Sequence, residues 1–121
     1  MNRKLIFRVL FILWTATIIT LTSIPKMQSP VGDIIGSDKV AHFTVYLIFA
    51  WLFLKMHGKD VNRHILNRLV LLSVGVPILD ELHQIPIPGR QFSVWDMLAD
   101  FIGFSIIILI YNRKLKAINR L

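Results

Sequence analysis

Apolar residues fall into four long stretches along this chain, and short polar segments separate them. A helix of about 20 residues crosses the ~30 Å hydrocarbon core of a membrane, because each residue adds about 1.5 Å along the helix axis. The second stretch is the shortest and spans the core only if its polar first turn lies at the interface or inside the bundle. The pattern predicts transmembrane helices at about residues 5–24, 39–54, 66–84 and 93–112.

Proline and glycine residues mark the connections between these helices. Pro25 ends the first stretch, and residues 25–37 form the first connection. The segment 85–92 is so short that the last two helices must be antiparallel neighbours. We therefore expect an all-α fold in which residues 1–121 form a single membrane domain, an integral bundle of four transmembrane helices.

The polar segments alternate in charge along the chain. Of the seven acidic residues, only Asp60 lies in the segments that carry most of the lysines and arginines. These basic segments hold Arg3, Lys4, Arg8, Lys55, Lys59, Arg63, Arg68, Arg113, Lys114, Lys116 and Arg120. Short loops rich in Lys and Arg stay in the cytoplasm. Both termini are therefore predicted to be cytoplasmic, and the acidic segments face the outer side.

Composition excludes several classes of protein. With 55% hydrophobic residues in 121, the chain is not an ordinary soluble globule. The net charge of +7 would suit nucleic acid, but the basic residues flank apolar stretches, so membrane lipid is the expected partner and nucleic acid is not. The absence of cysteine excludes disulfides, thiolate metal sites and thiol nucleophiles. No small-x-small cleavage site follows the first stretch, which is therefore interpreted as a retained helix.

Three polar groups lie near the outer ends of the predicted helices. Residues three or four apart share one face of a helix, so the first and third groups each line a common face, and in the second group Glu81 and Gln84 do so. The groups are Asp38, His42 and Tyr46; Asp80, Glu81 and Gln84; and Asp96 and Asp100. An ionisable side chain within a span costs roughly 2.5–3.5 kcal/mol unless it is paired or hydrated, and such residues usually mark a functional site. The groups therefore predict one outward-facing polar pocket.

Simpler explanations exist for parts of this pattern. Asp38 would favour the first turn of a helix through the helix dipole, and Ser93 with Asp96 resembles a capping box. All of the polar residues would also serve as hydrogen-bonding glue between helices. Asp100 resists these explanations, because it lies well inside the last span and a purely apolar run follows it.

The chemistry of the predicted pocket stays open. Arg90 would supply a planar fork for a carboxylate or phosphate. The carboxylates and His42 would suit a hard divalent cation, but their spacing matches no metal motif, so neither a metal site nor a cofactor is predicted. No nucleophile elbow or H-E-x-x-H motif is present, which leaves the catalytic residues unassigned. Glu81 and His42 are the candidates for general acid–base catalysis.

Several motifs, taken together, resemble the VanZ-like family of bacterial membrane proteins. Asp38 to Phe43 follow a D-K-x-x-H-F pattern, and the resemblance extends from about residue 37 to residue 104. The family takes its name from a protein that gives low-level teicoplanin resistance. It usually has Asn where this chain has Asp100. The resemblance implies one ligand-binding site formed by Asp38, Lys39, His42, Glu81, Gln84, Arg90, Asp96 and Asp100.

The leading hypothesis is a multi-pass protein of the bacterial cell membrane that binds a polar or anionic envelope group. Its partners would be membrane lipid and a lipid-linked envelope precursor or lipoglycopeptide, and binding would affect teicoplanin susceptibility. In the alternative, the chain is a small hydrolase or transferase acting on a lipid-linked precursor, with Glu81 or His42 as acid–base. The third hypothesis is that the polar residues only hold the helices together.

Overall fold

The computed structural model describes residues 2–24, 37–90 and 92–119, without the side chains of residues 37 and 38. These residues form four α-helices and one short 3-10 helix, which confirms the all-α class. The elements are α1 (Arg3–Ser23), α2 (Ser37–Lys55), η1 (Gly58–Asp60), α3 (Arg63–Gln84) and α4 (Val94–Asn119).

Local sequence explains where the helices begin and end. The side chain of Asn2 accepts a hydrogen bond from the backbone N–H of Lys4, and Asn62 does the same for Ile65, so that each caps its helix. The Asn62 cap places the start of α3 at Arg63, before the predicted residue 66. Helix α4 continues past the predicted residue 112, since its last turns contain Lys, Leu and Ala, which all favour helix.

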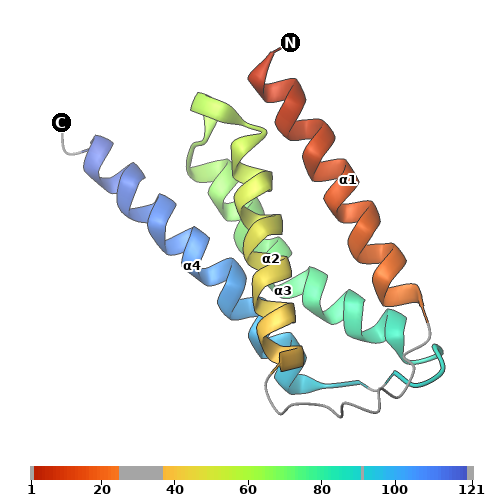
Figure 1. Ribbon diagram of the computed structural model, residues 1–121. Coiled ribbons are helices and arrows are strands. Elements are labelled where there is room, and N and C mark those ends of the chain that lie inside the picture. Colours follow the sequence, from red (N-terminus) through yellow and green to blue (C-terminus); the bar gives the residue numbers. More distant parts are fainter. Residues whose placement is uncertain (1, 25–36, 91, 120–121) are drawn as a thin grey trace.

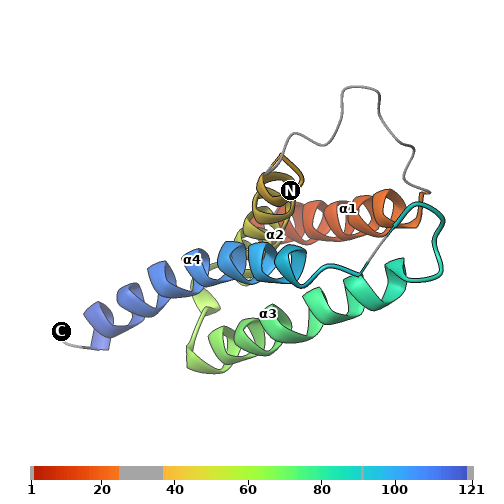
Figure 2. The ribbon, with the colours of Figure 1, turned by 90° about the horizontal axis from the view of Figure 1, so that it is seen from below.

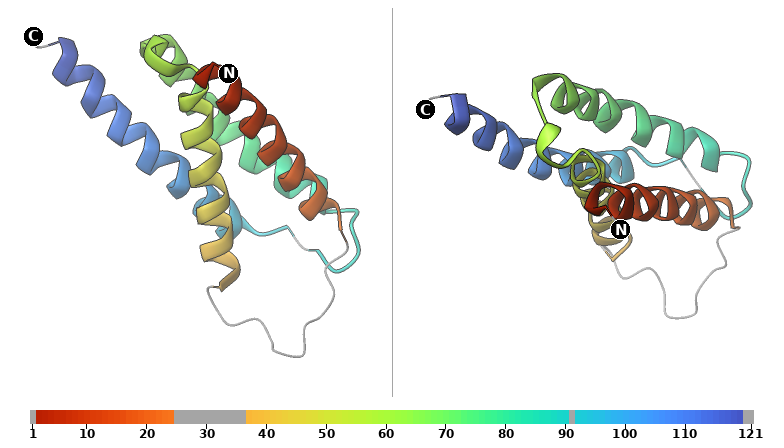
Figure 3. Two further views of the ribbon diagram at one scale, coloured as in Figure 1. Left: turned by 45° about the horizontal axis from the view of Figure 1, so that its top comes forward. Right: turned by 90° about the horizontal axis from the view of Figure 1, so that it is seen from above.

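Successive helices run in opposite directions along the bundle (Figure 1). Both ends of the described chain and η1 lie at one end, and the connection from α3 to α4 lies at the other. Helix α2 lies between α1 and α4 in two views (Figures 1 and 3) and makes its most extensive contact with α4. Helix α3 packs mainly against α4, on the side away from the start of α2 (Figure 2).

The end of the bundle that holds η1 carries most of the basic residues. Its one acidic residue, Asp60, forms an ion pair with Lys4 of α1. The hydrogen bond and charge of Lys4 hold the pKa of Asp60 below its usual value. Gly58 allows this turn, because its φ of 60° is one that residues with a side chain rarely adopt. The other described acids, near the end of α3 and the start of α4, lie toward the opposite end of the bundle.

Much of the surface of the bundle is apolar. Helices α1 and α4 are long and apolar enough to cross a membrane. Large apolar side chains are also exposed on α3, where Leu71 is 74% exposed and Leu79 is 66% exposed. A contiguous exposed apolar surface of this kind is unfavourable in water and favourable in lipid. The fold is therefore consistent with a membrane protein.

Helices α2 and α4 approach each other closely at Gly103. A Cβ atom added there would lie only 2.5 Å from the backbone oxygen of Phe43 and 3.0 Å from the nitrogen of Leu47. Small residues permit this packing of helices in membranes. Tyr46 and Phe104 stack beside the crossing, with ring centroids 5.5 Å apart. This contact brings the first turns of α2 and α4 together.

Candidate functional site

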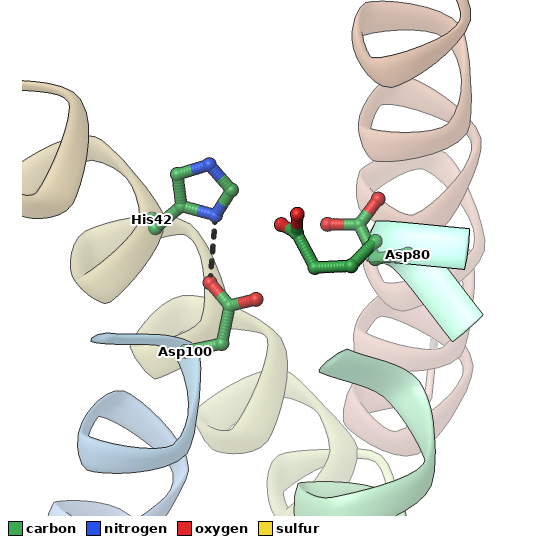
Figure 4. A group of neighbouring side chains, drawn as sticks. His42, Asp80 and Asp100 are labelled. Atoms are coloured by element: carbon green, nitrogen blue, oxygen red, sulfur yellow. Dashed lines mark hydrogen bonds and ion pairs between the residues drawn. The ribbon is translucent and has the colours of Figure 1, made fainter. Parts of the chain in front are cut away.

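His42 of α2 lies between two carboxylates of α4. Its Nδ1 atom is 2.8 Å from Oδ1 of Asp100 (Figure 4), and its Nε2 atom is 3.5 Å from Oδ2 of Asp96. Asp96 and Asp100 are one helical turn apart and so share a face, as the spacing predicts. Asp100 is completely buried, and Asp96 is 6% exposed. The imidazole is thus fixed by both carboxylates.

Lys39 extends the same group of charges. Its ammonium forms an ion pair with Oδ1 of Asp96, and the lysine side chain remains partly exposed. Lys39 lies three residues before His42, so both side chains reach Asp96 from one face of α2. The structure therefore joins these residues into one cluster. The side chain of Asp38, which the sequence places on this face, lies outside the described part of the chain.

Glu81 connects α3 to the start of α4. Its Oε2 atom accepts a hydrogen bond from the backbone N–H of Ser93, 2.9 Å away, and the residue is completely buried. The hydroxyl of Ser93 accepts a hydrogen bond from the N–H of Asp96, at 3.2 Å. This is half of the predicted capping box. In a complete capping box the side chain of Asp96 would accept a hydrogen bond from the N–H of Ser93. Here Glu81 accepts that hydrogen bond, and the carboxylate of Asp96 is directed to Lys39 and His42 instead.

Asp80 belongs to the cluster, although it is not among the residues that the sequence assigned to the binding site. The hydroxyl of Tyr46 donates a hydrogen bond to Oδ2 of Asp80, at 2.9 Å. The side chain of Asp80 approaches the space between His42 and Asp100 from α3 (Figure 4). The signal for Asp80 was its position inside an apolar helix, next to Glu81. Adjacent residues point about 100° apart on a helix, so the sequence did not place both on one face.

Two other predicted residues occupy the margins of the cluster. Gln84 is buried one turn beyond Glu81, and its Nε2 atom has no hydrogen-bond partner among the described residues. Arg90 donates hydrogen bonds to the backbone oxygens of Leu21, at 2.8 Å, and Ile24, at 3.2 Å. It thereby satisfies carbonyls at the end of α1 that have no partner within the helix.

A pocket of about 170 Å³ opens beside the cluster, between α1, α2 and α3. Most of its wall is apolar, and α1 and α2 supply nine of its eleven lining residues. Its ionisable members include His42 of α2, Asp80 of α3 and Arg90 of the α3–α4 connection. Its lining includes the apolar side chains of Trp14, Ile18 and Leu21 and the polar side chains of His42, Asp80 and Arg90. A pocket with an apolar wall and a few convergent polar groups is typical of a small-ligand site.

The chemistry of the cluster is dominated by acids. Four buried carboxylates, those of Asp80, Glu81, Asp96 and Asp100, approach one imidazole. One ligand atom from each of four residues lies within 4.8 Å of the others, and these residues are His42, Asp80, Glu81 and Asp100. Such an arrangement favours a cation, an ammonium group or hydroxyl donors over a bare anion.

Comparison with known proteins places this chain among its relatives. An uncharacterized protein of Saccharomyces cerevisiae, YJR112W-A, is 32% identical over 77 residues, which cover 55% of this chain and 70% of the yeast protein. No solved structure matches the chain. The VanZ/LLP1 family model matches residues 3–116, which include every described member of the cluster. The chain is therefore a member of the VanZ/LLP1 family.

Proposed function

We propose that this chain is a multi-pass protein of the bacterial cell membrane, with four membrane-spanning helices and both termini in the cytoplasm. The alternation of the helices and the basic residues near both ends of the chain support this orientation. The exposed apolar side chains would face lipid. The polar cluster and the pocket would then lie toward the outer leaflet.

We further propose that the pocket binds a polar or anionic group of an envelope lipid, with anionic oxygens at Arg90 and with hydroxyl or amine groups of the same ligand facing the acidic cluster. The observation that carries this proposal is the position of Arg90 at a pocket whose other wall is apolar. Arginine has five N–H donors, and within the described residues the hydrogen bonds to Leu21 and Ile24 use two of them. The remaining donors suit a phosphate, while the apolar wall suits the beginning of an acyl chain.

Binding of this kind would change how lipoglycopeptides engage the envelope. A protein that holds a lipid-linked precursor or a lipid headgroup at the outer leaflet alters what a bulky antibiotic meets there. Teicoplanin susceptibility is therefore the phenotype to measure. Asp100 would orient His42 beside the bound group, since its Oδ1 atom lies 2.8 Å from the imidazole.

The test is expression of the chain in a teicoplanin-susceptible bacterium, with membrane abundance and the inhibitory concentration measured together. We expect Arg90→Gln to remain in the membrane and to lose protection. Asp100→Asn should keep protection, because an amide oxygen can still accept a hydrogen bond from His42. Asp60→Asn is the matched control, because this acid lies at the other end of the bundle.

Each result has a separate meaning. An abundant Arg90→Gln variant that protects as well as the wild type would contradict the binding role of Arg90. Loss of Arg90→Gln from the membrane would show that Arg90 acts through α1. Native mass spectrometry of the purified protein with anionic and zwitterionic lipids tests lipid binding directly, and Arg90→Lys separates the effect of charge from that of the fork.

A further inference from the structure

We infer that His42, Asp80, Glu81 and Asp100 form a binding site for one divalent transition-metal ion. One ring nitrogen and three carboxylate oxygens, one from each residue, all lie within 4.8 Å of one another. They come from three helices: α2 supplies the histidine, α3 the adjacent pair of acids, and α4 the last aspartate. Figure 4 shows His42, Asp80 and Asp100 converging on one space.

Two buried oxygens point to a missing partner at this place. Oε1 of Glu81 and Oδ2 of Asp100 have no hydrogen-bond partner among the described residues, and both side chains are 0% exposed. An unsatisfied buried polar atom costs about 1–3 kcal/mol, and more when it is charged. The second oxygen of Glu81 accepts the N–H of Ser93, and the second oxygen of Asp100 lies 2.8 Å from Nδ1 of His42, a contact that coordination of the metal through that nitrogen would replace. Each carboxylate is thus held in position with one oxygen left for a ligand.

The charge of the cluster supports the same conclusion. In the described part of the chain, ion pairs link these acids to Lys39 and His42, and Lys39 is directed to Asp96 rather than to the four converging residues. Buried carboxylates gathered without matching positive charge are strongly unfavourable at low dielectric constant. A divalent cation would supply the missing charge at the point where their oxygens meet.

The donor set indicates the class of metal. Calcium and magnesium take oxygen ligands, whereas imidazole suits zinc, iron and related ions. One imidazole with three carboxylates fits Zn²⁺ or Mn²⁺. Ligand atoms in such sites lie about 2.0–2.2 Å from the ion, so two ligands of a tetrahedral ion are about 3.3–3.6 Å apart. Spacings of up to 4.8 Å between the present ligand atoms would need to close by roughly 1.2–1.5 Å on binding, through rotation of the side chains.

The test is metal binding by the full chain, purified in detergent without a histidine tag and stripped with a chelator. Equilibrium dialysis against Zn²⁺, read by elemental analysis, should give about one ion per chain, and the melting temperature should rise with Zn²⁺. Glu81→Gln and Asp100→Asn should each weaken binding by more than about 100-fold. Both variants retain an oxygen acceptor for Ser93 or His42, so the fold should survive.

Two controls exclude binding elsewhere. His83→Ala removes an exposed histidine near the cluster, and Asp60→Asn removes the acid at the other end of the bundle. Both should bind Zn²⁺ like the wild type. Absence of stoichiometric Zn²⁺ or Mn²⁺ binding by the wild type would overturn the inference. So would binding that His83→Ala abolishes or that Glu81→Gln and Asp100→Asn leave unchanged.

If Glu81→Gln and Asp100→Asn do not fold, a spectroscopic measurement on protein with an unchanged site still tests the inference. Of the four histidines, His57, His64 and His83 lie outside the cluster and can be replaced together by alanine. Mn²⁺ bound to this variant should show pulsed-EPR coupling to an imidazole nitrogen, which only His42 can supply. Absence of the coupling would overturn the inference. The inference does not rest on lipid binding, which the comparison of Arg90 variants reads separately.

Discussion

Single buried charges in this bundle depend on particular partners. Asp96 illustrates this, because the sequence offered two explanations for it, a helix cap and a member of the polar pocket. In the structure its backbone N–H is capped by Ser93, while its carboxylate pairs with Lys39 and faces His42. Glu81 completes the cap from α3. The carboxylate of Asp96 is thus a link between helices, and the cap is made by Ser93 and Glu81.

Replacement of Lys39 tests this link. Lys39→Met would leave the carboxylate of Asp96 buried without its ammonium partner, and loss of one partner of a buried polar pair costs about 1–3 kcal/mol. We expect the lower half of that range, because Lys39 is partly exposed and solvent screens the pair. The measurement is thermal unfolding in detergent.

Lys4→Met is the matched control for this prediction. Lys4 also pairs with an aspartate, but both side chains are exposed, and such pairs contribute little to stability. The melting temperature should therefore stay close to that of the wild type. Equal losses in the two variants would show that the Lys39 pair has no special role.

At the scale of the helices, the crossing of α2 and α4 determines where the cluster forms. Gly103 lets the two backbones meet at Phe43. Phe43 follows His42 in α2, and Gly103 lies one turn after Asp100 in α4. Helix α1 is attached through Trp14, whose Nε1 atom donates a hydrogen bond to the backbone oxygen of Val45 at 3.0 Å. The hydrogen bonds from Arg90 hold the end of the same helix.

Gly103→Ala should separate α2 from α4. The new methyl group would lie 2.5 Å from a backbone oxygen, which cannot move without a shift of the helix. Overpacking of this kind costs about 1–3 kcal/mol. We expect a lower melting temperature and weaker metal binding, measured on the same purified sample.

Gly75→Ala provides the opposite case on α3. Apart from the neighbouring residues and backbone of its own helix, no atom lies within 4 Å of the position of its Cβ, and alanine favours helix by about 0.8–1.0 kcal/mol over glycine. Its melting temperature should be unchanged or slightly raised. If both alanine variants behaved alike, the contact at Gly103 would not be the cause.

At the scale of the whole molecule, charge is segregated between the two ends of the bundle. Arg3, Lys4 and η1 lie at one end, and the acidic cluster lies toward the other. The membrane orientation proposed above follows from this asymmetry, because the end rich in Lys and Arg stays inside. The assignment of residues 1–121 to a single domain stays a prediction.

Cysteine labelling tests the orientation, and the chain contains no native cysteine to interfere. Pro86→Cys lies in the connection from α3 to α4, while Lys59→Cys and Ala117→Cys lie at the basic end. In intact cells, a membrane-impermeant thiol reagent should label the first variant and should label the other two only after the membrane is permeabilised. The reverse pattern would place the termini outside.

The sequence by itself determined the four helices, the gathering of acids near one end and the family motifs. Long apolar stretches, capping residues and charge are local properties that can be read along the chain. Helix bounds differed most where helix-favouring residues continued beyond the apolar stretch, as in α4.

Only the tertiary structure decided which polar atoms meet. It brought Asp80 to the site beside Glu81, directed Arg90 to the end of α1, and used Glu81 to cap α4. These outcomes depend on how each helix is rotated about its axis and how closely it approaches its neighbours. Those quantities arise from packing between residues far apart in the chain, such as Gly103 against Phe43, and no local pattern contains them.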